Sequence, residues 1–145
     1  MTDRAARVWQ TAYRAAWVHP VSAPAIADGA VIVEGDRIVW VGPASQAPGL
    51  PQACVVELGD VALTPGLVNA HTHLDLTVMR GLFDGTAFFD WIRGIVAARA
   101  QLTEDETLDS ARLGAVEALE AGITTVADTS PTAASLQAMA ELGLR

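Results

Sequence analysis

The feature that most constrains the fold is an alternation of short apolar segments with helical segments in the second half of the chain. Residues 61–70 form a near-continuous apolar stretch, and residues 123–127 form a shorter one. Between about residues 87 and 121 apolar side chains recur at helical spacing, and a last helical segment stops near Gly143. Strands that alternate with helices are typical of a parallel sheet, and continuous apolar strands are typical of burial on both faces. We therefore expect an α/β fold with two adjacent parallel strands joined by a helical crossover.

The ends of the expected helices carry local signals. Residues 103–106, Thr-Glu-Asp-Glu, match a capping box, in which the threonine and last glutamate side chains each accept a hydrogen bond from a free backbone N–H. Gly122 stands where a helix-ending glycine is expected, and Ser130 before Pro131 indicates the start of the last helix. One face of the longest helical segment is apolar, and its residues are Leu108, Ala111, Ala115 and Leu119.

The first part of the chain favours a small sheet. Residues 30–34 and 37–41 are rich in β-branched side chains, and the Gly35-Asp36 pair between them is a strong hairpin signal. Residues 54–58 resume the strand pattern after a break rich in proline. None of these segments carries residues that suggest chemistry.

Composition excludes several classes of function. The chain has 17 acidic against 9 basic residues, a net charge of −8, which repels phosphate groups, so nucleic acid is not an expected partner. No apolar run approaches the roughly 18 residues of a membrane span, and the first residues lack the apolar core of a signal peptide. The single cysteine, Cys54, cannot form an internal disulfide and is interpreted as a small core residue. We therefore expect a cytoplasmic protein with no membrane partner.

His71 and His73 follow directly on the apolar stretch 61–70 and are the first candidates for a site. Side chains two residues apart on a strand point to the same face, and imidazole is the commonest metal ligand. Barrel enzymes keep their active sites at the carboxyl ends of the strands, where these two histidines are expected. The pair therefore predicts two ligands of one metal ion, whereas the third histidine, His19, is interpreted as structural.

The segment Pro65-Gly-Leu-Val-Asn-Ala-His-Thr-His-Leu-Asp75 resembles the first-strand signature of the amidohydrolase superfamily. Residues 77–81 and 88–92 add further matches, and residues 122–128 resemble the second barrel strand of that family. Residues 28–42 resemble its amino-terminal sheet. The resemblance covers the chain from about residue 12 onward, with its motifs in the order of the family.

This resemblance implies the amino-terminal part of a (β/α)8 barrel of TIM type, preceded by a small β-sandwich module. We assign residues 1–60 to the module and residues 61–145 to the first two β/α units. The branch that the chain resembles contains nucleobase, nucleoside and triazine deaminases and chlorohydrolases. Their chemistry implies one divalent metal, zinc or else iron, whose bound water ionises and attacks a ring carbon of a nitrogen heterocycle. A second copy of the chain is a further expected partner.

Two further side chains are candidates for binding the substrate. Trp91 either packs in the core or stacks on a heterocycle. Arg99 precedes a Leu-Thr turn, where relatives that act on adenosine-like thioethers carry an acidic residue that grips the ribose hydroxyls. A guanidinium suits a carboxylate-bearing substrate instead, as in deaminases of aminofutalosine type, and a solvated helix face is the alternative.

Two acidic residues flank the expected site. Asp75 either orients a histidine N–H or caps the following turn, and Asp128 is interpreted as structural or as supporting a ligand. No histidine follows His73, so the chain holds neither the third metal ligand nor the proton-shuttling histidine that the resemblance implies. We expect an enzyme fragment that is inactive alone, binds zinc weakly and associates through uncovered apolar faces. The alternatives are a cyclic-amide hydrolase of imidazolonepropionase type and a non-catalytic remnant.

Overall fold

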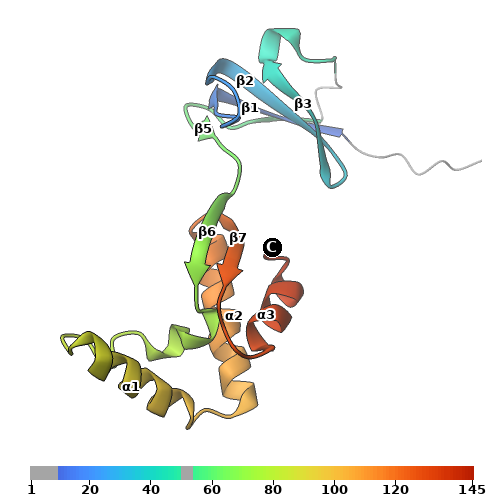
Figure 1. Ribbon diagram of the computed structural model, residues 1–145. Helices are drawn as coiled ribbons and strands as arrows, with labels where there is room; N and C mark the ends of the chain where they lie inside the picture. Colours follow the sequence, from blue (N-terminus) through green and yellow to red (C-terminus); the bar gives the residue numbers. More distant parts are fainter. Residues whose placement is uncertain (1–9, 50–53) are drawn as a thin grey trace, which may run out of the picture. The chain divides into compact units, whose positions relative to one another are not determined.

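The computed structural model describes residues 10–49 and 54–145, and the chain divides into two compact units between Pro65 and Gly66 (Figure 1). The apolar stretch 61–70 crosses this division, so the expectation of one continuous strand there is wrong. Residues 62–63 pair with a strand of the first unit, and residues 67–72 pair with a strand of the second. Pro65 and Gly66 lie between the two, where a proline that lacks an N–H and a flexible glycine interrupt strand pairing.

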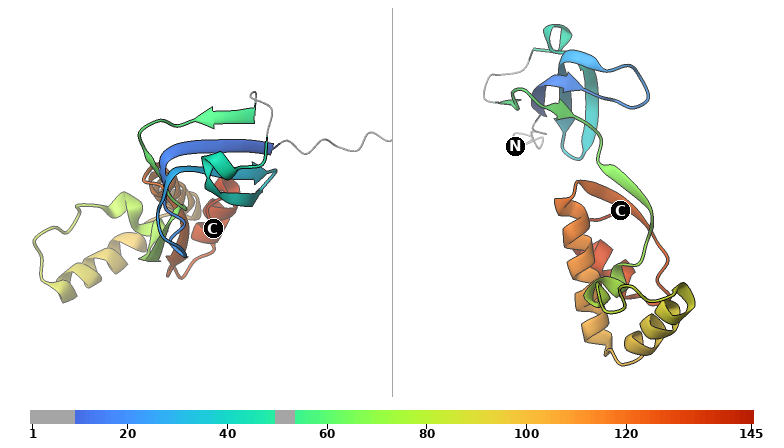
Figure 2. Two further views of the ribbon diagram at one scale, coloured as in Figure 1. Left: turned by 90° about the horizontal axis from the view of Figure 1, so that it is seen from above. Right: turned by 90° about the vertical axis from the view of Figure 1, so that its left-hand side faces the viewer.

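The first unit is a single five-stranded sheet. Its strands β1 to β3 are antiparallel neighbours, and β4 and β5 pair with β1 in parallel. The pairing of Glu34 with Arg37 confirms the hairpin expected at Gly35-Asp36. The bounds are β1 Gln10–Val18, β2 Ile26–Glu34, β3 Arg37–Pro43, a 3-10 turn η1 Ala44–Gln46, β4 Val55–Glu57 and β5 Ala62–Leu63. Figure 2 shows this sheet, coloured blue to green, from two further sides.

The core of this sheet is small and apolar. Its most buried large side chain is Ile32, and Cys54 is only partly buried and does not belong to this core. A cavity of about 480 Å³ lies over other apolar side chains, among them Tyr13, Val33 and Ile38. The residues that the structure describes provide one sheet, and the second sheet of the expected sandwich is not among them.

The second unit holds the two parallel strands and the helices. Strands β6 and β7 pair in parallel, which confirms the expected adjacency, and α1 and α2 lie between them in sequence (Figure 1). No helix of the described residues is long and apolar enough to cross a membrane. The bounds are β6 Leu67–Thr72, a 3-10 segment η3 Leu74–Met79, α1 Phe88–Arg99, α2 Glu104–Glu120, β7 Ile123–Asp128 and α3 Ala134–Leu142.

Local sequence signals explain three of the six ends of the α-helices that the structure describes. Thr103 and Glu106 form the predicted capping box at the start of α2, and Gly122 follows α2 with a φ of 79°. Gly143 ends α3 in the left-handed conformation, with a φ of 72°. The predicted cap at Ser130 is wrong, because α3 begins after Ala133 with no side-chain cap. The Ser130 hydroxyl donates instead to a buried carboxylate described below.

Packing in this unit differs from the expectation in two ways. The apolar face of α2 is not left uncovered, since Ala111 and Ala115 are fully buried in a cluster with residues of β7 and α3. Strand β6, expected to be buried on both faces, leaves Leu67 and Val68 mostly exposed, at 55% and 68%. Among the described residues β6 has a strand neighbour along one edge only, which accounts for this exposure.

Candidate metal centre

The two histidines predicted to bind metal lie together at the carboxyl end of β6. His71 belongs to the strand, His73 follows it, and both side chains are exposed. Their ring centroids are 5.1 Å apart, and the ring planes are nearly perpendicular at 83°. Two imidazoles on one tetrahedral zinc, at Zn–N distances of about 2.0–2.1 Å, place their centroids roughly 5 Å apart. The spacing therefore suits two ligands of a single ion.

The end of β7 holds this segment in place. The backbone N–H of Thr129 donates to the carbonyl of Thr72 at 2.9 Å, and the Thr129 hydroxyl donates to the same oxygen at 3.1 Å. The same hydroxyl oxygen lies 3.2 Å from each ring nitrogen of His73. Sequence reasoning missed Thr129, although parallel pairing of the two strands places their carboxyl ends at one edge.

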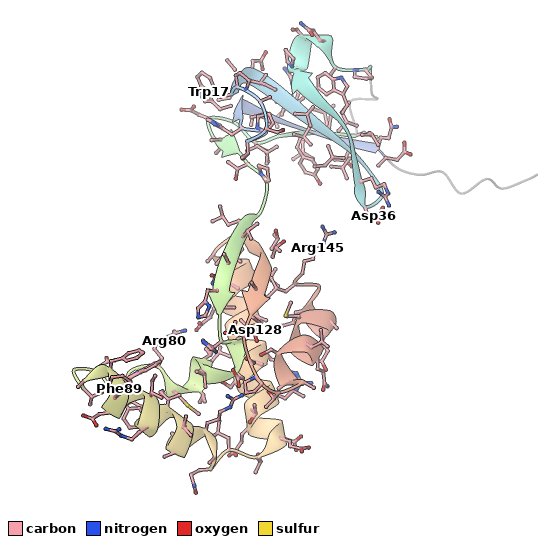
Figure 3. The ribbon with its side chains drawn as sticks, in the orientation of Figure 1. Trp17, Asp36, Arg80, Phe89, Asp128 and Arg145 are labelled. Atoms are coloured by element: carbon pink, nitrogen blue, oxygen red, sulfur yellow. The ribbon has the colours of Figure 1, made fainter. Side chains whose placement is uncertain are left out.

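Asp128 supports the same segment from the last position of β7 (Figure 3). Its carboxylate accepts hydrogen bonds from the backbone N–H of Leu74 at 2.7 Å and from that of Ser130 at 2.9 Å. Partial burial acts to raise the pKa of Asp128, but these hydrogen bonds outweigh it and hold the pKa below its usual value. The carboxylate thus fixes the backbone beside His73, in keeping with a structural interpretation of Asp128.

Asp75 is fully buried and is the hub of a polar network. One carboxylate oxygen accepts from the guanidinium of Arg99 and the other from the hydroxyl of Ser130. The Asp75 carbonyl accepts from the Ser110 hydroxyl of α2 at 2.9 Å, and Ser135 of α3 donates to Ser130 at 2.9 Å. The Asp75 carboxylate therefore neither accepts from a histidine ring nor caps the turn that follows it. Both roles expected from the sequence are wrong.

The two residues predicted to bind substrate both lie on α1. Trp91 is partly exposed and stacks on Phe88, with ring centroids 6.3 Å apart and planes at 18°. The Arg99 side chain is 23% exposed and is paired with Asp75, so this ion pair accounts for the guanidinium without a substrate carboxylate. Arg99 also lines a cavity of about 550 Å³ beside the start of α2, whose lining does not include either candidate histidine.

A complete metal centre is not formed by the residues described here, because no group of three or more His, Cys, Asp or Glu side chains is gathered in ranges 10–49 and 54–145. His19 lies in the sheet unit, near Trp17, in keeping with a structural interpretation. The arrangement brings two candidate metal ligands together and places Thr129 against one of them, His73.

The fold and the paired histidines define a class of protein, and comparison with known proteins agrees. The model of the amidohydrolase family matches residues 62–145. The chain therefore belongs to the amidohydrolase family.

Within this family, the chain is similar to several deaminases and a triazine hydrolase. The chain is 37% identical over 120 residues to the 5-methylthioadenosine/S-adenosylhomocysteine deaminase of Symbiobacterium thermophilum, a match that covers 81% of this chain and 28% of that protein. A zinc-bound adenosine deaminase from Xanthomonas campestris matches with a TM-score of 0.77 and 27% identity, over 94% of this chain and 33% of that one. A triazine hydrolase variant matches with a TM-score of 0.72 and 25% identity, over 94% and 34%. The chain thus spans about a third or less of the proteins that it resembles.

Proposed function

We propose that this chain provides two ligands, His71 and His73, to the metal site of a hydrolase that deaminates a nitrogen heterocycle. The observation that carries the proposal is the 5.1 Å spacing of the two rings at the carboxyl end of β6, beside the end of a parallel neighbour. The relatives named as deaminases, one of them with bound zinc, support the reaction class and the metal. Zinc is the expected ion, with iron as the alternative.

The residues present fit a catalytic ion because both candidate ligands are neutral side chains that leave its positive charge largely uncompensated. When bound, a divalent ion supplies the Lewis acidity that ionises water near neutral pH. The Thr129 hydroxyl donates to the Thr72 carbonyl, and its oxygen lies 3.2 Å from each ring nitrogen of His73, so it packs against the ring without being in line with either N–H. This contact holds the His73 ring, while Asp128 holds the adjoining backbone.

For the substrate we propose an aminopurine nucleoside, because the similar deaminases are named for adenosine and its 5′-thioether derivatives. Trp91 is the proposed stacking residue, since an indole provides a broad face for a heterocycle. A carboxylate-bearing substrate was suggested by Arg99. Its pairing with Asp75 supplies another reason for that guanidinium and makes a substrate without a carboxylate the simpler proposal.

Metal binding by residues 1–145 tests the proposal directly. Titration with Co²⁺ should broaden the imidazole proton resonances of His71 and His73. His73→Ala should remove most of this binding, whereas His19→Ala, on the sheet unit, is the matched control and should not change it. Two ligands hold an ion weakly, so we expect low affinity and no ammonia release from adenosine by this chain alone. Equal loss in both variants, or no binding at all, would contradict the assignment of the pair.

A further inference from the structure

Helix α1 is the least buried helix of the second unit. Of its residues only Ile95 is buried, and its first turn has no side-chain cap. Phe88, Phe89 and Val96 are more than 60% exposed, and Figure 3 shows Phe89 on this helix. Gly94 lies against the ring of Phe83, which belongs to the loop leading into the same helix. Apolar packing therefore fixes α1 only weakly against the rest of the unit.

A partly buried ion pair at the carboxyl end of the helix compensates for this weak packing. Arg99 stands in the last turn of α1, and its guanidinium pairs with Asp75, whose side chain is 0% exposed. Every other ion pair of the described residues joins side chains that are at least 38% exposed. An ion pair between exposed side chains contributes little to the free energy of unfolding. A buried carboxylate that loses its partner, in contrast, is strongly destabilising.

Asp75 also connects α1 with the histidine segment. It follows His73 by two positions, and its second carboxylate oxygen accepts from Ser130, in the loop after β7. Asp128, at the end of β7, binds the backbone of both Leu74 and Ser130. The path from Arg99 to the histidine segment therefore consists of directional hydrogen bonds, which define position more sharply than apolar contact does.

We propose that Arg99 and Asp75 are positioning residues that fix α1, and with it Trp91, relative to His71 and His73. The hydrogen bonds of Asp75 with Arg99 and Ser130 support the placement of α1. That this placement matters for substrate binding rests on the proposed function. Neither residue touches the substrate in this proposal. The pair acts by holding the helix, in place of a direct contact between Arg99 and a carboxylate.

The first test is amide hydrogen exchange on the whole chain, in Arg99→Gln and in a matched control, Arg93→Gln. Arg93 lies on the same helix but pairs with Asp90 at the surface. In Arg99→Gln the exchange of α1 amides should accelerate roughly tenfold or more, while amides of α2 and of the sheet unit change much less. Arg93→Gln should leave α1 exchange within about twofold of the original chain. Equal effects of the two variants would overturn the proposal.

A double variant separates position from simple stability. Asp75→Asn combined with Arg99→Gln removes both charges, so the penalty for an unpaired buried charge disappears. If the pair positions α1, the double variant should regain resistance to urea while α1 exchange stays fast, because the shorter glutamine cannot span to residue 75. Arg99→Lys retains a charge and should restore part of the protection. Protection of α1 that returns fully in the double variant would show a role in stability alone and would overturn positioning.

A spectroscopic test addresses the distance between Trp91 and the histidines. The chain labelled with 5-fluorotryptophan, with Trp91→Phe to assign the resonance, should show a Co²⁺-dependent ¹⁹F shift at Trp91. Arg99→Gln should diminish or broaden that shift without loss of Co²⁺, and Arg93→Gln should not. An unchanged shift in Arg99→Gln would overturn the proposal. If the original chain binds no Co²⁺, the proposed function fails, and hydrogen exchange still decides the role of the ion pair.

Discussion

The two units of this chain bury different kinds of side chain. In the sheet unit the buried residues within 10–49 and 54–65 are apolar, with Ile32 the largest of those nearly free of solvent contact. In the β/α unit the apolar cluster is accompanied by buried polar residues, which are Asp75, Thr107, Ser110 and Ser135. A buried polar group contributes to stability when all its hydrogen bonds are made. An alternative packing that leaves such a group without a partner is destabilised. Buried hydrogen bonds therefore define the geometry of the unit that carries the candidate site. The sheet unit is stabilised by strand pairing and apolar burial.

The strongest test of this difference is Asp75→Ala. The change leaves the Arg99 guanidinium and the Ser130 hydroxyl without their acceptor, and we expect a loss of about 3–5 kcal/mol from the free energy of unfolding of the β/α unit. Urea unfolding followed by far-UV circular dichroism measures it. Asp90→Ala, which removes an exposed pair with Arg93, should cost less than about 1 kcal/mol. Similar losses in the two variants would show that the buried position of Asp75 adds nothing to the stability of the β/α unit.

The matched change in the sheet is Ile32→Ala. Ile32 is 2% exposed, so its truncation should cost about 2–5 kcal/mol, the sum of lost burial and the cavity that remains. Hydrogen exchange of the β1 and β2 amides locates the loss in the sheet. Ile38→Ala is the control, because Ile38 is 67% exposed on the neighbouring strand and should change stability by well under the same amount. A loss as large at Ile38 would show that the uncovered face of the sheet is packed in solution.

Close packing beside the polar network predicts an intermediate effect for Gly114→Ala. A Cβ at this position of α2 would lie 2.3 Å from the Thr77 hydroxyl and 3.1 Å from the Leu74 carbonyl. Alanine favours a helix over glycine, but overpacking should prevail and cost about 1–3 kcal/mol in urea unfolding. Adding Thr77→Ala should recover part of the loss, since it removes the nearer atom. If Gly114→Ala made the chain more stable, η3 would have to shift away from the added Cβ at little cost in free energy.

The smallest expected effect is a pH dependence of the β/α unit. The backbone and side-chain hydrogen bonds of Thr103 hold the pKa of Glu106 below its usual value. A depressed carboxyl pKa contributes stability that is present above its usual pKa and is lost as the pH falls through the lowered one. Thermal unfolding between pH 6 and pH 3 should therefore show a shallow loss, which Glu106→Gln reduces. A steeper dependence in Glu106→Gln would contradict this sign.

Local features were predictable because neighbouring residues determine them. The hairpin at Gly35-Asp36 and the capping box at Thr103 each depend on residues within a few positions of one another, and both are present. The placement of His71 and His73 on one side followed from the two-residue period of a strand. Family membership was predictable for the same reason, because its motifs are short and contiguous.

Distant pairings were not predictable, and they define the surroundings of the candidate site. Arg99 and Asp75 are 24 residues apart, and Ser130 and Asp75 are 55 residues apart. By residue type alone, Arg99 is compatible with binding a substrate carboxylate, Asp75 with capping a turn and Ser130 with capping a helix. The sequence predicts these roles. Likewise, the apolar stretch 61–70 contains no mark that assigns its halves to different sheets, apart from Pro65-Gly66.

The sequence by itself determined the hairpin at Gly35-Asp36, the capping box at Thr103, the alternation of strands and helices in the second unit, and the pair of imidazoles at the end of a strand. These depend on backbone preference and side-chain period, which act over a few residues. Tertiary structure decided that Asp75 is buried, that Arg99 serves it, and that Thr129 stands against His73. The physical reason is that an ionised carboxylate in the interior must find donors wherever the packed chain brings them, and packing is a property of the whole unit.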